Sequence, residues 1–357
     1  MNFSFLSLTV QNVFSSSPIF NHAHSHSFSR FRLEKTYAGL FNGFGGKIID
    51  MKMSHFKKSL SSIVLINQDI NRSGCYYNGI SSYGSVNADQ CSFEQINHQD
   101  FALISSYSTL SVTYCYFLNI TNGGDYSSLL SMLYGDAVLK YSCIQLSKGY
   151  VASLRCSHGG VHASSAEVMY NLLMQCDSSH NYLLASTNLL TYFSTNESFS
   201  KGCTGSAHFH VPNTNGEPLR YHIAYKHDSR MYCSTNGDVT TSMQYVSIVK
   251  CVYSESIYYN ISPGVQYMYD WSIDAQTPYF FAGPTTVYAE RVIVYSSITD
   301  SFPSGFTKLE GFKMQSYVSF NPVECRMILP KEITFNIPPY PNHHILTLLF
   351  CAELISY

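Results

Sequence analysis

Three cysteines that recur at intervals of 24 and 28 residues constrain this chain more than any other feature of its sequence. They end the segments GSVNADQC, STLSVTYC and DAVLKYSC, at Cys91, Cys115 and Cys143. An aliphatic residue stands five places before each, and these residues are Val86, Leu110 and Val138. A repeat of this length is too short to bury its own apolar face, so successive units must stack on one another.

Strand alternation predicts which residues of the repeat face inwards. Val86 and Ala88 lie two places apart and share a face, and Cys91 then begins the next inward group, CSFEQI. Free cysteine behaves as a small buried hydrophobe, and eleven cysteines without a CxxC pair do not suggest a disulfide framework. We therefore expect a column of mostly reduced cysteines, with Val86, Leu110 and Val138 stacked beside it. The same frame recurs at 246–251, and at 287–292 with valine in the cysteine place.

These segments resemble the right-handed parallel β-helix (pectin-lyase-like) superfamily, and in character its non-catalytic protist members. The resemblance implies an all-β, single-stranded, right-handed parallel β-helix, a solenoid of about ten coils. We expect an irregular N-terminal segment or cap at 1–47, the β-helix at 48–320 and a C-terminal tail at 321–357. Few charges and many Ser, Thr, Asn and Tyr agree with β-structure, because aromatic and β-branched residues pack well on pleated surfaces.

Charge argues against several classes of partner. Charged residues make up 12 % of the chain and the net charge is −2, so nucleic acid is not an expected partner, and a strongly anionic polysaccharide is not favoured. Lys52, Lys57 and Lys58 form one of the few basic clusters, which we interpret as a solvated edge. No stretch approaches the roughly 18 apolar residues of a membrane-spanning helix, so no transmembrane segment is expected.

The sequence nominates no catalytic residue, metal site or cofactor. Polysaccharide lyases and hydrolases on this fold bring carboxylates together on one strand face, but this chain has no Asp-Asp or Asp-x-Asp pair in its coils. The nearest acids are Asp89 with Glu94, Asp270 with Asp274, and Glu217 with Asp228. Two histidine groups have spacings compatible with a metal, but both are better interpreted as solvated side chains: His22, His24 and His26, and His208 and His210 with Glu217 and His222.

Tyrosine supplies the remaining functional indication, with 29 copies against one tryptophan. Tyr267, Tyr269 and Trp271 alternate, so on one strand they would share a face, and aromatic faces stack on sugars and on partner side chains. They are the predicted binding residues. The expected function is a non-enzymatic scaffold or recognition protein that binds glycans or a protein partner at a cell surface. The alternative is a carbohydrate-active enzyme, a polysaccharide lyase or glycoside hydrolase of the pectin-lyase-like group.

Overall fold

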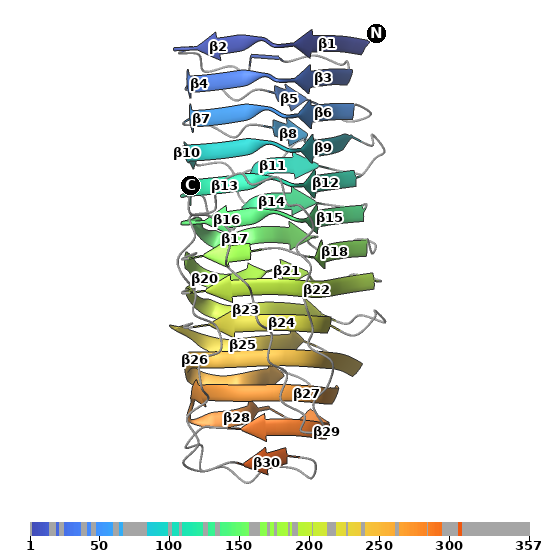
Figure 1. Cartoon of the computed structure of the whole chain (residues 1–357), viewed down its shortest axis with the longest axis vertical. Coiled ribbons are helices and arrows are strands. Elements are labelled where there is room, and N and C mark those ends of the chain that lie inside the picture. Colours follow the sequence, from blue (N-terminus) through green and yellow to red (C-terminus); the bar gives the residue numbers. More distant parts are fainter. Residues whose placement is uncertain are drawn as a thin grey trace, which may run out of the picture.

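The structure is a computed structural model of the whole chain. It describes residues 2–13, 19–20, 25–36, 41–43, 48–59, 64–66, 84–98, 102–106, 109–123, 128–132, 136–156, 165–169, 172–174, 177–184, 186–187, 192–201, 203–212, 219–225, 228–236, 240–260, 264–283, 285–294 and 306–308. These residues form β-strands and no helix. The described strands of successive coils pair in parallel, as a solenoid requires, and the coils stack along the long axis of the molecule (Figure 1).

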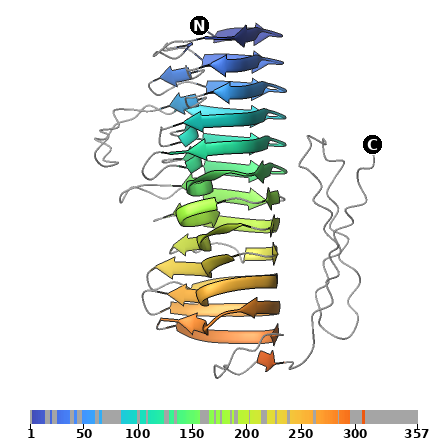
Figure 2. The same ribbon diagram turned by 90° about the vertical axis from the view of Figure 1, so that its left-hand side faces the viewer.

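The first part of the chain builds three stacks of short strands, and Figure 2 shows strands piled one above another along the long axis. The first stack is β1 (Asn2–Leu6), β3 (Ser25–Ser29), β6 (Ile48–Lys52), β9 (Ser85–Asp89), β12 (Thr109–Thr113), β15 (Asp136–Lys140) and β18 (Ser165–Met169). The second is β2 (Thr9–Gln11), β4 (Arg32–Thr36), β7 (His55–Ser59), β10 (Ser92–His98), β13 (Tyr116–Asn122), β16 (Cys143–Gln145) and β19 (Leu172–Met174). The third is β5 (Phe41–Gly43), β8 (Val64–Ile66), β11 (Ala102–Ser106), β14 (Ser128–Met132) and β17 (Lys148–Cys156).

Further along the chain the strands lengthen and run through positions that were corners in the earlier coils. Strand β26 alone pairs with both β24 and β25 on one side and with β27 and β28 on the other. The later strands are β20 (Asp177–Leu184), β21 (Ser186–Thr187), β22 (Tyr192–Lys201), β23 (Thr204–Pro212), β24 (Leu219–Tyr225), β25 (Asp228–Asn236), β26 (Thr240–Asn260), β27 (Gly264–Gln276), β28 (Tyr279–Ala282), β29 (Thr285–Val294) and β30 (Phe306–Lys308).

Two corners with left-handed backbone define a regular coil. The residue at each corner has a φ near +50° although it is not glycine, and the two corners lie five residues apart. About six successive coils have both corners, and these corner pairs are Ser7 and Asn12, Arg30 and Lys35, Met53 and Lys58, Gln90 and Gln95, Tyr114 and Asn119, and Tyr141 and Leu146. The expectation of a parallel solenoid is confirmed, but about six regular coils replace the ten that we expected.

Regular strands are also present within the expected N-terminal cap at 1–47. Strands β1 to β5, which we expected to belong to an irregular cap, pair in the same parallel ladder as the coils that follow. The local reason is that 25–29 and 32–36 carry the same alternation of buried and exposed residues as later coils. The expected tail at 321–357 lies outside the described residues.

A column of apolar side chains from the second strand stack fills the interior. Phe56 packs parallel to Phe93 with ring centroids 4.9 Å apart, and Phe93 packs on Phe117 at 4.8 Å. The strand register extends the column to Leu33 on one side and Ile144 on the other, and all five side chains are buried.

Cys91 and Cys115 lie in one column, as predicted, but Cys143 does not. Backbone hydrogen bonds from each coil to the next align Leu8, Phe31, Ser54, Cys91, Cys115 and Ser142 immediately after the first corner. The cysteine place of the third segment is therefore filled by Ser142, and Cys143, which takes part in a disulfide bond, pairs with Tyr116 instead. The same one-residue offset applies to Val138, which we expected to face inwards with Val86 and Leu110. Val138 is instead partly exposed, and its neighbours Ala137 and Leu139 are buried.

Each cysteine of this column donates its thiol hydrogen to main-chain carbonyls. Cys115 Sγ lies 3.3 Å from the carbonyl oxygen of Thr113 and 3.4 Å from that of Ala88 in the preceding coil. Cys251 makes the equivalent pair of contacts with Val249 and Ala224. Its register, however, places Cys251 after the second corner, next to Ala275 of the following coil. The sequence frame put Cys251 in the column of Cys91, and the structure does not.

Candidate functional site

Tyr267 and Tyr269 lie side by side on the outer surface of β27, as the alternation predicted. Their rings are nearly parallel, with centroids 6.3 Å apart. Tyr288 of β29 stacks on Tyr267 at 5.1 Å and is 54 % exposed. The repeat at 287–292 includes Tyr288 but does not link it to the other two tyrosines, because only the strand register aligns Tyr267 with Tyr288. We call Tyr267, Tyr269 and Tyr288 the tyrosine cluster.

Trp271 does not belong to this surface. Its side chain is 1 % exposed, its indole N–H donates to the carbonyl oxygen of Met243 at 3.1 Å, and its ring meets Tyr232 edge-on at 5.9 Å. The alternation fails because Asp270 has a φ of +59°, which turns the following side chain towards the interior. The prediction that Trp271 shares a face with Tyr267 and Tyr269 is therefore wrong.

Polar side chains surround the tyrosine cluster. Ser242 and Gln244 of β26 are in register with Tyr267 and Tyr269, and Glu290 of β29 is in register with Tyr269. Arg291 forms a two-pronged ion pair with Asp270, with N···O distances of 2.6 and 3.0 Å. The cluster therefore combines aromatic rings with amide, hydroxyl and carboxylate groups, a combination typical of sites that recognise polar ligands with flat apolar faces.

The acids that an enzyme of this fold would need are engaged individually. Asp89 accepts a hydrogen bond from Thr113 at 2.9 Å, and Glu94 pairs with Lys57 at 3.1 Å. Burial raises the pKa of Asp274, although the backbone N–H and the charge of Lys250 oppose this rise. Among the described residues these carboxylates do not form a pair, Asp228 is exposed, and Glu217 lies outside them.

The histidines weighed as metal ligands do not form a described cluster. His26 is buried among the rings of Phe5, Phe20 and Phe28, while His22 and His24 lie outside the described residues. The side chains of His208, His210 and His222 are likewise not described. In the part of the chain that can be described, no group of three His, Cys, Asp or Glu side chains could hold a metal ion.

The buried thiols and phenols are stabilised in their neutral forms. Burial raises the pKa of Cys115, Cys233, Tyr232 and Tyr253 well above their ordinary values. Five described cysteines are buried and not disulfide-bonded: Cys91, Cys115, Cys203, Cys233 and Cys251. Since the thiolate is the nucleophile, the raised pKa of Cys115 and Cys233 favours a packing role for these two residues, as the sequence predicted for its column.

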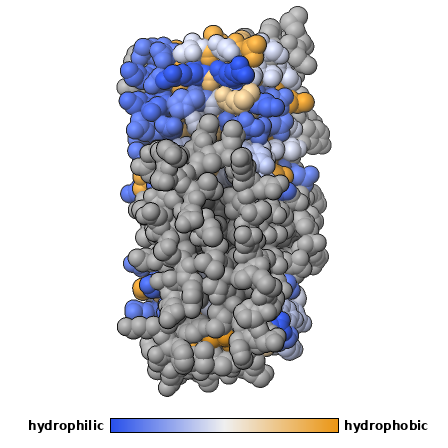
Figure 3. Space-filling model, in the orientation of Figure 1, coloured by the Kyte–Doolittle hydropathy of each residue, from blue (hydrophilic) through white to orange (hydrophobic). Residues whose placement is uncertain are grey.

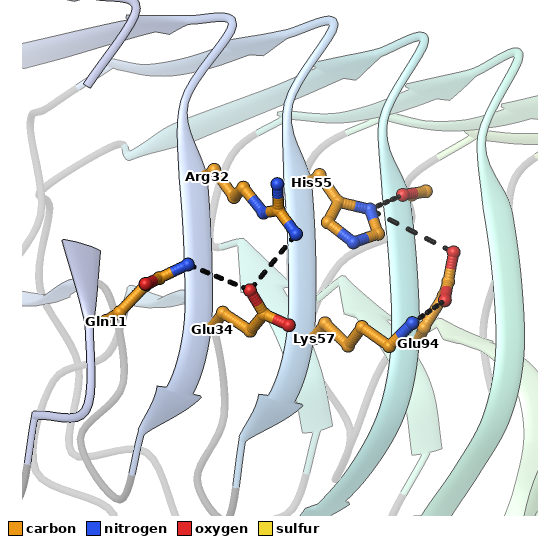
Figure 4. Close-up of polar contacts among 7 residues, drawn as sticks. Gln11, Arg32, Glu34, His55, Lys57 and Glu94 are labelled. Atoms are coloured by element: carbon orange, nitrogen blue, oxygen red, sulfur yellow. Dashed lines mark hydrogen bonds and ion pairs between the residues drawn. The ribbon is translucent and has the colours of Figure 1, made fainter. Parts of the chain in front are cut away.

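A polar ladder that the sequence did not reveal crosses the outer face of β2, β4, β7 and β10 (Figure 4). Arg32 pairs with Glu34 at 3.1 Å, and Gln11 donates to the same carboxylate at 3.0 Å. His55 Nδ1 is hydrogen-bonded to Ser92 Oγ and lies 3.9 Å from Glu94. Its hydrogen bonds join residues that are 23 positions apart in one step and 37 positions apart in another. Because these intervals differ, the sequence did not predict the ladder.

Burial lowers the pKa of His55, and the nearby carboxylate of Glu94 partly opposes the effect. The imidazole is hydrogen-bonded to the Ser92 hydroxyl through Nδ1. Because Ser92 and Glu94 both approach this one nitrogen, the group lacks the arrangement of a catalytic triad, in which the base contacts its two partners through different nitrogens.

Comparison with known proteins finds no relative of this chain. No family model matches the chain. No curated protein and no solved structure matches it either. Within the described residues, no helix is long and apolar enough to cross a lipid bilayer. The chain is thus assigned to the parallel β-solenoids by its own strand pairing.

Proposed function

We propose that this protein is a non-enzymatic β-solenoid scaffold that recognises a glycan at a cell surface through the tyrosine cluster. The observation that carries the proposal is the stack of Tyr267, Tyr269 and Tyr288 on two adjacent coils, with exposed edges and polar neighbours. Stacked aromatic side chains hold a preformed contact area that costs little conformational entropy on binding.

The carbohydrate-active enzyme is the less favoured reading. Its two carboxylates would have to converge on one scissile bond, whereas Asp270 is committed to Arg291 and Glu94 to Lys57. Coil steps of 23, 24 and 27 residues, beside a longer step of 37 residues, support kinship with the pectin-lyase-like superfamily, and we include its non-catalytic members in the proposal.

Glycan-array binding of the full chain tests this function. We expect the triple variant Tyr267→Ala, Tyr269→Ala, Tyr288→Ala to lose about tenfold or more in affinity, because each aromatic contact contributes roughly 0.5–1.5 kcal/mol. The matched control is Tyr114→Ala with Tyr141→Ala. It removes another pair of stacked tyrosines, with ring centroids 4.9 Å apart, on coils distant from the tyrosine cluster. Trp271 is unsuitable as a probe because its burial couples it to folding. Absence of glycan binding by the native chain, or equal loss in the control, would refute the proposal.

A further inference from the structure

The first three coils concentrate positive charge on one end of the solenoid. Residues 25–59 hold seven of the chain's 21 Lys and Arg but only two of its 23 Asp and Glu, an excess of five positive charges in a chain of net charge −2. Figure 3 shows hydrophilic and hydrophobic side chains next to each other at this end of the molecule. The low net charge of the whole chain therefore conceals a local basic surface.

Four of these cations are exposed and lie at or beside corners. Arg30 and Lys52 are at the first corner, where the Arg30 N–H donates to the Lys52 carbonyl at 3.0 Å, and Lys35 and Lys58 are at the second. No ion pair to a described acidic residue involves any of the four, in contrast to Arg32 and Lys57 between them. Asp89 is in register with Lys52, but its carboxylate accepts from Thr113.

The coil register forces like charges onto adjacent coils. In the strand register of β4 and β7, Glu34 is opposite Lys57 and Thr36 is opposite Ser59. Lys35 is therefore opposite Lys58, with the two strands about 4.8 Å apart. Like charges opposite each other on neighbouring strands are destabilising. A bound layer of anions would offset this repulsion.

Exposed apolar side chains accompany the cations at the first corner. Leu6 is 75 % exposed and Met53 is 40 % exposed. The register places Leu6 in the same column as Ser29 and Lys52, and Met53 is at the corner directly after Lys52. We call Leu6, Arg30, Lys35, Lys52, Met53 and Lys58 the basic end.

We infer that the basic end binds the surface of an anionic phospholipid bilayer. The cations attract lipid phosphate and carboxylate groups, each by about 1 kcal/mol, while Leu6 and Met53 enter the boundary between headgroups and acyl chains. A nucleic acid or a sulfated polysaccharide would use the cations but would leave both apolar side chains in water. The tyrosine cluster lies on β27 and β29, at the opposite end of the stack (Figure 1), so membrane attachment would hold the proposed recognition surface away from the lipid.

Vesicle co-sedimentation of the full chain tests this inference. We expect binding to vesicles of phosphatidylcholine with phosphatidylserine, weakening as salt is raised, and little binding to phosphatidylcholine alone. Arg30→Gln with Lys52→Gln should reduce the affinity about 30-fold, since two cations contribute roughly 2 kcal/mol. Leu6→Ser with Met53→Ser should also weaken binding while leaving its salt dependence unchanged.

The matched control is Arg230→Gln with Lys250→Gln, which removes the same charge from the exposed surface of distant coils. It should bind vesicles as the native chain does. Absence of binding to anionic vesicles, or equal loss in the control, overturns the inference. The inference is also overturned if the chain binds heparin or single-stranded DNA through the basic end but does not bind vesicles, because the surface would then recognise another polyanion. Glycan binding is measured separately, so either proposal can fail alone.

Discussion

At His55, burial of the side chain in the fold affects its protonation. Its ring is half-buried between the coils of Arg32 and Ser92, and burial holds its pKa below the ordinary 6.5. When the pKa of a base is lower in the folded chain than in the unfolded chain, the stability of the folded chain is not reduced by this group at pH values above the unfolded-state pKa. Stability is lost as the pH falls from about 6.5 towards the folded-state pKa.

We therefore expect the free energy of unfolding of the native chain to fall between pH 7.5 and about pH 5, and to fall less in His55→Gln. Glutamine can still accept from the Ser92 hydroxyl, so the variant should fold at neutral pH. Urea unfolding at a series of pH values gives the comparison. An identical pH dependence in both proteins would show that His55 does not titrate as described.

At this scale the sequence predicts exposure only where a strand is regular. Tyr267 and Tyr269 were placed correctly because β27 alternates up to that point. Trp271 was misplaced because Asp270 is left-handed, and no glycine marks the turn. The corner residues are Ser, Arg, Met, Gln, Tyr, Asn, Lys and Leu. Apart from Asn, these types ordinarily avoid the left-handed conformation, so composition does not locate the corners.

The element that repeats is the corner with its inward side chain. Ser54 and Ser142 occupy the same place as Cys91 and Cys115, and each donates its hydroxyl hydrogen to the carbonyl two residues earlier at 2.9 Å. Cysteine makes the same contact at longer distance. In these four coils the place holds serine or cysteine, a small side chain that donates a hydrogen bond, whereas Leu8 and Phe31 occupy it in the first two coils.

Cys115→Ser should therefore change the free energy of unfolding by less than about 1 kcal/mol, whereas Cys115→Val should cost about 1–3 kcal/mol. Valine is larger and β-branched, and it leaves the Thr113 carbonyl without the donor. Thermal or urea unfolding of both variants measures the difference. A serine variant as unstable as the valine variant would mean that volume alone decides the position.

The exchange of serine for cysteine also explains the limit of prediction at this scale. The interval of 24 residues between Cys91 and Cys115 was identified correctly from the sequence. The next coil has 27 residues and ends in Ser142 followed by Cys143, so a search for cysteine selected the neighbour of the corner. The polar ladder was missed for a related reason, because one of its steps is 37 residues long.

At the scale of the whole molecule, the described strands pair with strands of the coils before and after their own, so energetic coupling should be local. Phe56→Leu and Phe93→Leu remove partners whose rings are stacked at 4.9 Å, and we expect their effects on unfolding to couple by about 0.5–1.5 kcal/mol. Phe56→Leu with Trp271→Phe, at opposite ends of the stack, should be additive within about 0.5 kcal/mol. Urea unfolding of single and double variants supplies both cycles, and strong coupling between the distant pair would contradict a linear architecture.

The one long coil shows how this architecture accommodates extra chain. Strand β8 (Val64–Ile66) follows β7 at the same interval at which β5 follows β4, but β9 begins only at Ser85. All the additional length therefore enters between Ile66 and Ser85, and the coils on either side still meet in register through Asp50 and Asn87. Because β6 and β9 stay in register on either side of this point, we expect that a foreign peptide grafted between Ile66 and Ser85 leaves their stacking intact.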